Sequence, residues 1–319
     1  MHEPRLDFRI PISPTPSFFA QVRLFNFALR RLGAAYEKAR LTVVVGDRCD
    51  IEWVRSQNRW SETHNVVWER VPDEVFDEFG IWGTANWRLS LPAGDAEVIV
   101  LSDADTVLLL DIDPILPDLA LDAAVIRGHM AHFPPPSGGP DAPDGRSAAF
   151  WPWLFGQFGM EPATRTHRYS MDETQNLPLA PAYFNLGFVA MNPAGLSILG
   201  AGIVDAERRI NALTQSHMRC QIAVTMIAHK AGADIGAVPA EYNAANDLKH
   251  FTHNRLQPAD IRVAHYLRLE EIDRSVFPLP ENIDAFLSKT LENPVNIEIQ
   301  KLVRAYRETL EAAADLSAA

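Results

Sequence analysis

The sequence predicts an α/β protein with a mostly parallel central sheet flanked by helices. In the first half of the chain, short apolar runs alternate with amphipathic stretches, a pattern typical of strands joined by crossover helices. The 319 residues are 47% apolar and 22% charged, which is enough for a large core. No Ser/Gly-rich linker divides them, so we expect one domain over residues 1–290 and a C-terminal helical extension over residues 291–319 that packs on or flanks it.

The first elements are predicted as strand, helix and strands. Residues 8–12 form a short apolar strand closed by a proline-rich turn. An amphipathic helix follows, with Ser17 as its N-cap and Gly33 marking its end, because apolar residues recur at three- and four-residue steps. Residues 41–45 predict a second strand, and residues 66–67 a third, shorter one.

The later part of the chain continues this alternation. We expect further strands at residues 98–101, 106–110, 182–191 and 261–266, and helices at residues 221–230 and 297–316. Residues 133–149 are rich in Pro, Gly and Asp and predict a loop without regular structure. Trp151 and Trp153 follow directly and either line a pocket or anchor this loop to the core.

Two carboxylates interrupt the apolar run Val98–Leu110. Asp103 and Asp105 are two residues apart, so in extended chain both side chains project from one face, roughly 7 Å apart. A buried ionised carboxylate costs several kcal/mol unless it is paired, protonated or bound to a metal. Because oxygen ligands suit Mg²⁺ and Mn²⁺, we expect a divalent cation here. The alternative is a polar strand end at which Asp begins a turn.

Charge and composition exclude several classes of partner. The net charge of −12 leaves no general basic surface for nucleic acid. The N-terminus has no apolar signal core, and no stretch of 18 uncharged apolar residues predicts a membrane span. Cys49 and Cys220 form no metal pattern and fit a reducing compartment. We expect a cytoplasmic protein, whose only membrane contact would be peripheral, at the inner face.

The order of these motifs resembles the metal-dependent GT-A glycosyltransferases, within them the glycogenin and bacterial lipopolysaccharide galactosyltransferase type. The resemblance covers roughly residues 8–268, as short motifs. Its strongest part, Val98–Val107, is similar to the family's metal strand with its Asp-x-Asp. Asp111 and Asp113 form a second Asp-x-Asp, but Asp113 precedes Pro114 and is better explained as a helix N-cap.

A second motif is the stretch Pro181–Asn192. It resembles the family's Tyr-Phe-Asn-Ser-Gly segment, in which the asparagine side faces the donor sugar. The resemblance therefore places Asn185 and Gly187 at the donor. Leu186 stands where the family usually has a small residue.

A third motif is Val263–Tyr266, which is similar to the family's late strand with a metal-binding histidine. The resemblance implies that Asp103, Asp105 and His265 hold Mn²⁺ or Mg²⁺, a ligand set compatible with these ions. Arg268 lies close to the position of a family lysine at the donor diphosphate.

Position in the family assigns the remaining contacts. Arg88 lies upstream of the metal strand, where the family has a basic donor contact; a surface salt bridge is the alternative. Cys220 and Gln221 replace an Asp-Gln pair, so Gln221 stays a candidate sugar contact. The resemblance thus assigns catalytic roles to Asp103, Asp105, Arg88, Asn185 and Gln221, and donor or nucleoside binding to Ile12, Ser13, Thr15, Arg88, Ser102, Asp103, Ala104, Asp105, Asn185, Gly187, Gln221, His265 and Arg268.

The sequence is thus interpreted as a glycosyltransferase that moves a hexose from a UDP-sugar to a glycan, lipid-linked or small-molecule acceptor, with retention of configuration as in the family. Residues 133–149 are expected to form a mobile lid over the acceptor side. Residues 103–107 also fit the nucleophile motif of haloacid-dehalogenase-type phosphatases, in which Asp103 would attack phosphorus. A binding protein on a decayed transferase scaffold is a further alternative, suggested by Cys220 and Leu186.

Overall fold

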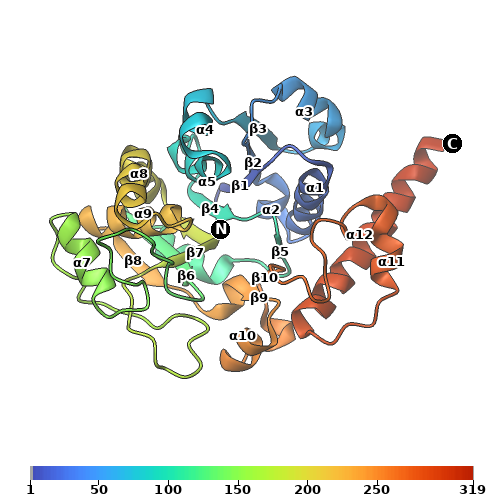
Figure 1. The fold of residues 1–319 in the computed structure, drawn as a ribbon. Helices are drawn as coiled ribbons and strands as arrows, with labels where there is room; N and C mark the ends of the chain where they lie inside the picture. Colours follow the sequence, from blue (N-terminus) through green and yellow to red (C-terminus); the bar gives the residue numbers. More distant parts are fainter. Residues whose placement is uncertain (1–2, 319) are drawn as a thin grey trace.

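A seven-stranded sheet forms the centre of the structure, a computed structural model that describes residues 3–318, with side chains described through residue 311 (Figure 1). The strand order is β3-β2-β1-β4-β7-β6-β8. Four of the six strand pairings are parallel, which confirms the predicted α/β class and mostly parallel sheet. The strands are β1 (Leu6–Ile12), β2 (Arg40–Val45), β3 (Val66–Arg70), β4 (Val98–Ser102), β6 (Val125–Met130), β7 (Phe184–Met191) and β8 (Asp234–Ala237).

Helices cover both faces of this sheet, and β4 shows how the sequence encodes that arrangement. Ile99 and Leu101 pack in one core cluster, with α5, α7, α8 and α9. Val98 and Val100 pack in the cluster on the other face, with α1, α2 and α6. A strand buried on both faces reads as a continuous apolar run, as β4 does. The helices named here are α1 (Pro16–Arg30), α2 (Ala34–Lys38), α5 (Ile81–Ser90), α6 (Leu116–Leu119), α7 (Phe150–Gln157), α8 (Pro193–Thr214) and α9 (Arg219–Lys230).

Strand β7 runs antiparallel to both of its neighbours, β4 and β6. Ser102 at the end of β4 pairs with Phe188, and Met130 at the end of β6 pairs with Phe184. The start of β7 therefore meets the carboxyl ends of the parallel strands. Ligands of open α/β sheets bind at that edge.

The apolar run after the acidic pair does not extend the central sheet. Residues Thr106–Leu108 form β5 of a three-stranded sheet with β10 (Val263–His265) and β9 (Ala244–Ala245). Strand β10 is antiparallel to β5 and parallel to β9. The chain turns out of the central sheet at residues 103–105, and this turn joins the two sheets.

Two predicted helix caps are wrong. Thr15, not Ser17, caps α1, because its side chain accepts from the amide of Phe18 at 3.4 Å and proline fills the first helical position. Asp113 does not cap the following helical turn; its side chain accepts from the Tyr36 hydroxyl at 2.6 Å. The carboxylate of Asp111 accepts from the Asp113 amide instead, at 3.1 Å.

Residues 133–149 form no helix or strand, as predicted, but they are tied to the end of α8. The amides of Gly138 and Gly139 donate to the carbonyl of Thr214 at 2.8 and 3.1 Å. Trp151, on α7, is 4% exposed and donates from its indole to the Tyr169 hydroxyl at 2.9 Å. Trp151 therefore anchors this part of the chain to the core rather than lining a pocket.

The C-terminal helix packs on the same body (Figure 1). Helix α12 (Pro294–Ala318) contributes Ile299 and Leu302 to a core cluster with Ala264 and Tyr266 of the β10 region. The helices not yet named are α3 (Ile51–Gln57), α4 (Asp73–Phe79), α10 (Leu248–His253) and α11 (Ile283–Leu287). None of the helices in the described range, residues 3–318, is both long and apolar enough to cross a membrane.

Candidate active site

Asp103, Asp105 and His265 come together at the junction of the two sheets. The two carboxylates lie in the turn between β4 and β5, and the histidine ends β10. The pairing of His265 with Thr106 places the ring beside this turn, and one ligand atom from each of the three residues lies within 4.8 Å of the others. The structure therefore brings together the three residues that the sequence predicted as metal ligands.

Asp105 is the better neutralised of the two carboxylates. Its Oδ1 lies 3.2 Å from His265 Nε2, and its Oδ2 accepts from the Arg274 guanidinium. Burial raises the pKa of Asp105, but His265 and Arg274 outweigh this effect and bring the pKa to about 2. Arg274 was not predicted, since it lies in an irregular segment after β10 without a motif.

Asp103 is less well compensated. Its side chain is 33% exposed, and its one ion pair among the described residues, with Arg88 Nη2, is 3.4 Å long. Burial raises the pKa of Asp103, and the negative charge of Asp105 adds to this against the opposing effect of Arg88. A cation placed between the two carboxylates would relieve this repulsion, so the donor set fits a divalent metal.

A chain of amide groups fixes the orientation of His265. Its Nδ1 lies 2.9 Å from Asn243 Oδ1, and Asn243 Nδ2 donates to Asn185 Oδ1 at 3.0 Å. Because the amide oxygen of Asn243 can only accept, Nδ1 of His265 carries a proton, and Nε2 is the nitrogen that faces Asp105. Metal-binding histidines are commonly held in this way by a second hydrogen bond. Asn243 lacks any sequence signal that could have singled it out.

Gly187 allows this arrangement, because a side chain at that position would strike the histidine. A Cβ atom would lie 2.7 Å from His265 Nδ1 and 2.9 Å from Asn185 Oδ1. The Gly187 amide also donates to Asn185 Oδ1 at 2.8 Å. The side-chain oxygen of Asn185 thus accepts from the Gly187 amide and from Asn243, and contact of Asn185 with a donor sugar remains a prediction.

Arg88 is fully buried, and all five of its N–H donors are directed at protein oxygens. These acceptors are Asp103 Oδ1 and the carbonyl oxygens of Ala85, Arg9, Ser102 and Leu186, at 2.6–3.4 Å. Arg88 therefore ties Asp103 to the backbone of β1, β4 and β7. To contact a diphosphate, as predicted, it would have to release one of these bonds.

The other predicted residues make hydrogen bonds of their own, and none of those described below involves Asp103, Asp105 or His265. Ile12 ends β1 at the same sheet edge as Asp103, and the Ser13 carbonyl accepts from the Thr15 amide at 2.8 Å. Gln221 lies in the first turn of α9, where its Nε2 donates to Met218 Sδ at 3.5 Å. Arg268 donates to Asp247 Oδ2 at 2.9 Å.

Two further backbone positions shape the turn itself. The Ala104 carbonyl accepts from the Tyr266 hydroxyl at 3.1 Å, and the Ser102 carbonyl accepts from Arg88 at 2.6 Å. Ser102 Oγ is buried without a hydrogen-bond partner in the described part of the chain.

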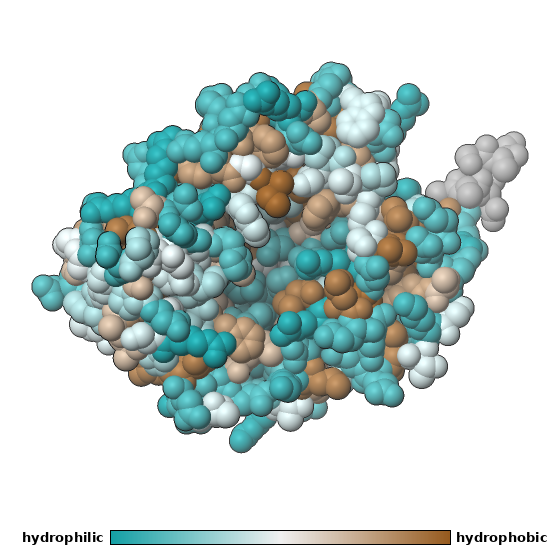
Figure 2. Space-filling view, viewed as in Figure 1, coloured by the Kyte–Doolittle hydropathy of each residue, from teal (hydrophilic) through white to brown (hydrophobic). Residues whose placement is uncertain are grey.

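In the space-filling view the surface is hollowed near the middle of the face, over the region where Figure 1 places β7 and β10 (Figure 2).

Comparisons with known proteins show only distant structural similarity. No protein-family model and no curated protein matches the chain. Solved structures that resemble it include mouse xyloside xylosyltransferase 1 in its apo form, with 14% identity over 82% of this chain and 97% of that one, TM-score 0.45. The apo WbbM bifunctional glycosyltransferase has 11% identity over 95% of this chain and 52% of that one, TM-score 0.49. Core-mannan synthase A from Aspergillus fumigatus in its Mn/GDP form has 9% identity over 74% and 73%, TM-score 0.44.

Proposed function

We propose that the protein is a metal-dependent GT-A glycosyltransferase that takes its sugar from a nucleotide diphosphate donor. The observation that carries the proposal is the convergence of Asp103, Asp105 and His265 at the carboxyl edge of the sheet. Asn185 and Gly187, at the start of the antiparallel strand β7, adjoin this set through the Asn243 bridge. The motif resemblance predicted this combination from separate parts of the chain.

The site residues divide into ligands and supports. Asp103, Asp105 and His265 would hold Mn²⁺ or Mg²⁺, which when bound supplies charge stabilisation to the departing diphosphate. Asn243 keeps the histidine in the ligating tautomer, and Arg88 holds Asp103 in place. Arg274, paired with Asp105, brings a second positive charge to the same edge. Because the two arginines offset the two carboxylates, a bound divalent cation would leave this edge with a net positive charge for a leaving diphosphate.

The finer assignments belong to this proposal as well. We infer a UDP-hexose donor, with the nucleoside near Ile12, Ser13 and Thr15 at the end of β1. Gln221 would contact the sugar and Arg268 the diphosphate. Retention of configuration, and a glycan, lipid-linked or small-molecule acceptor, complete the proposed reaction.

The phosphatase alternative is disfavoured by the surroundings of Asp105. In that mechanism the second aspartate serves as acid and base, and efficient acid catalysis needs a pKa close to the working pH. Here both carboxylate oxygens of Asp105 are engaged, by His265 and Arg274, and its pKa of about 2 keeps it ionised. Asp105 is thus suited to binding a cation rather than donating a proton.

The test is calorimetric titration of UDP with and without Mn²⁺. Asp105→Asn should abolish the Mn²⁺-dependent part of UDP affinity while circular dichroism stays unchanged. Asp111→Asn is the matched control, since it alters the second Asp-x-Asp of the chain and should keep wild-type affinity. Unchanged Mn²⁺-dependent affinity in Asp105→Asn would contradict the ligand assignment.

Turnover distinguishes the remaining alternatives. A transferase should release UDP slowly from one UDP-sugar of a panel, and proton NMR of the product with its acceptor gives the anomeric outcome. Hydrolysis of simple phosphomonoesters that is lost in Asp103→Asn would overturn the proposal in favour of the phosphatase. Tight UDP-sugar binding without any turnover would indicate a binding protein.

A further inference from the structure

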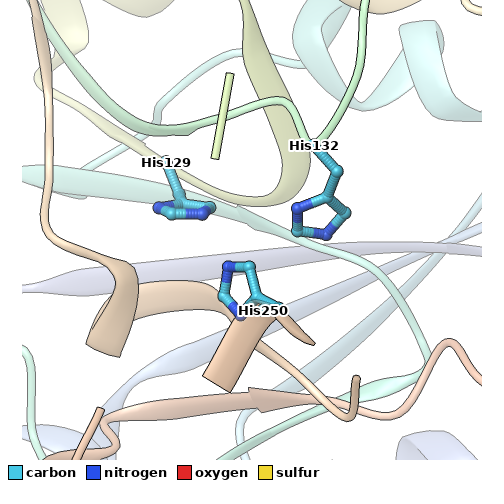
Figure 3. A group of neighbouring side chains, drawn as sticks. All are labelled: His129, His132 and His250. Carbon is cyan, nitrogen blue, oxygen red and sulfur yellow. The ribbon is translucent and has the colours of Figure 1, made fainter. Parts of the chain in front are cut away.

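Three histidines form a second cluster of potential metal ligands, separate from Asp103, Asp105 and His265. His129 lies on β6, His132 two residues beyond this strand, and His250 on α10 (Figure 3). Their rings face a common space, and one nitrogen from each lies within 4.8 Å of the others. The ring centroids are 5.1–6.0 Å apart.

Most nitrogens of this cluster lack hydrogen-bond partners although they are buried. His129, His132 and His250 are 3%, 9% and 0% exposed. Within residues 3–318, Nε2 of His132 and both ring nitrogens of His250 have no hydrogen-bond partner. His129 has only the backbone of Val238 and Pro239 within reach of its ring. Buried polar atoms are normally satisfied, so three unpartnered nitrogens in one place require an explanation. A cation bound between the rings would supply it.

The backbone around the cluster is built to hold the rings in place. The register of β6 against β7 shifts between Gly128 and Met130, and such bulges re-aim side chains. His132 Nδ1 lies 2.7 Å from Ser170 Oγ, which leaves Nε2 as the free nitrogen. Asn254, at the end of α10, donates to the Ser170 carbonyl at 3.0 Å and so ties the helix to the same segment.

The protonation of the three rings is compatible with binding a metal. Burial lowers the pKa of His129 to about 4 and that of His250 to about 3, and it lowers the pKa of His132 well below its usual value. The rings are therefore neutral at physiological pH, as ligation requires. His265 lies near enough for its charge to contribute to all three shifts. The cluster thus adjoins the candidate active site.

We propose that His129, His132 and His250 form a second metal site, which binds a zinc-class transition cation and ties α10 to the end of β6. Three imidazoles favour Zn²⁺ over the harder Mn²⁺ and Mg²⁺, which prefer oxygen ligands. Tetrahedral Zn²⁺ with Zn–N bonds of about 2.0–2.1 Å needs nitrogens about 3.3 Å apart. The three nitrogens lie within 4.8 Å of one another, so each pair would close by about 1.5 Å at most. A water completes four ligands. A cavity of about 490 Å³ is lined by Phe133 and Lys249, which flank His132 and His250 in the chain.

The experiment uses the full chain in the Asp105→Asn background, which removes the other site, after treatment with a chelator. Co²⁺ is the probe, because its visible absorption reports four- or five-coordinate nitrogen sites, and Zn²⁺ is then added as competitor. We expect one Co²⁺ per chain, displaced by Zn²⁺. Adding His250→Gln should lower the affinity at least about 100-fold, more than the loss of a supporting residue does.

A second variant keeps the test valid if His250→Gln fails to fold. Ser170→Ala retains all three imidazoles and removes only the partner of His132, so it should weaken Co²⁺ binding about 10- to 100-fold. In the otherwise wild-type chain, His250→Gln should leave Mn²⁺-dependent UDP binding unchanged, which separates this site from the proposed function. No stoichiometric Co²⁺ or Zn²⁺ binding in Asp105→Asn, or equal binding after both His250→Gln and Ser170→Ala, would show that the cluster is only packed core.

Discussion

Gly187→Ala is expected to damage the candidate active site without replacing any proposed metal ligand. The new Cβ would lie 2.7 Å from His265 Nδ1 and 2.8 Å from Cε1 of the same ring, about 0.7 Å inside ordinary contact at 3.4 Å. The ring cannot retreat freely, because Asn243 holds it at 2.9 Å and Asp105 at 3.2 Å.

Relief of this overlap must displace either the histidine or strand β7. Overpacking of a filled site costs typically 1–3 kcal/mol, and the loss of the hydrogen bond to Asn243 adds about 1 kcal/mol. We therefore expect the free energy of unfolding to fall by about 2–4 kcal/mol in urea titrations. Mn²⁺-dependent UDP affinity should fall at least about tenfold in calorimetry, because displacing groups that orient a metal ligand typically costs about 10- to 100-fold in metal affinity.

Gly202→Ala is the matched control on helix α8. Its Cβ would meet Ile227 at 3.6 Å, an ordinary contact, so the exchange should be neutral or stabilise the helix by up to about 1 kcal/mol. If Gly187→Ala kept both the unfolding midpoint and the metal-dependent affinity of the wild type, the close packing of His265 on β7 would be refuted.

Two further predictions concern pH and mobility. Burial raises the pKa of Glu207 to about 7 despite its 2.6 Å ion pair with Arg219, so its contribution to stability is present below about pH 4.5 and is lost as the pH rises through 7. In urea titrations, the free energy of unfolding of the wild type relative to Glu207→Gln should therefore rise by up to about 3 kcal/mol when the pH is lowered from 8 to 5. A difference between the two proteins that does not change with pH would contradict this. For residues 133–149, hydrogen exchange should slow when UDP-sugar and acceptor are added, while the amides of Gly138 and Gly139, already bonded to Thr214, change least. Equal exchange rates throughout the loop in free and bound protein would rule out a lid.

The sequence predicts the parts of this protein that are encoded locally. The apolar runs of β1, β2 and β4 identify strands because each is buried on both faces, and the Asp-x-Asp is visible because two charges interrupt such a run. His265 could be linked to the pair only through the order of motifs in a family. The contact itself spans 160 positions, the separation of residues 105 and 265.

Other features depend on tertiary structure and have no local signal. The antiparallel direction of β7 cannot be read from its own apolar run, since periodicity is the same in either direction. Asn243 and Arg274 have irregular sequence surroundings, and only the packing of β10 and α1 brings them to the site. Gln21 of α1, for example, donates to the Arg274 carbonyl at 3.1 Å. The Ser17 cap was wrong because Thr15 and Ser17 flank the same proline, and only backbone geometry distinguishes them.

The direction of β7 has a consequence for how this fold can diversify. The chain leaves the sheet after Met130 and returns at Phe184, which is its partner in the ladder, and the Ala131 amide donates to the Tyr183 carbonyl at 2.8 Å. The segment between them is thus a closed excursion that begins and ends beside the candidate active site. Part of this segment is core, because Phe150, Trp151 and Leu154 of α7 pack against the sheet. Residues 133–149 carry no helix or strand, and since the entropy of closing a loop grows only slowly with its length, that stretch can be lengthened or shortened at little thermodynamic cost. Insertions or deletions at residues 133–149 would therefore reshape this flank of the molecule and leave Asp103, Asp105 and His265 in place.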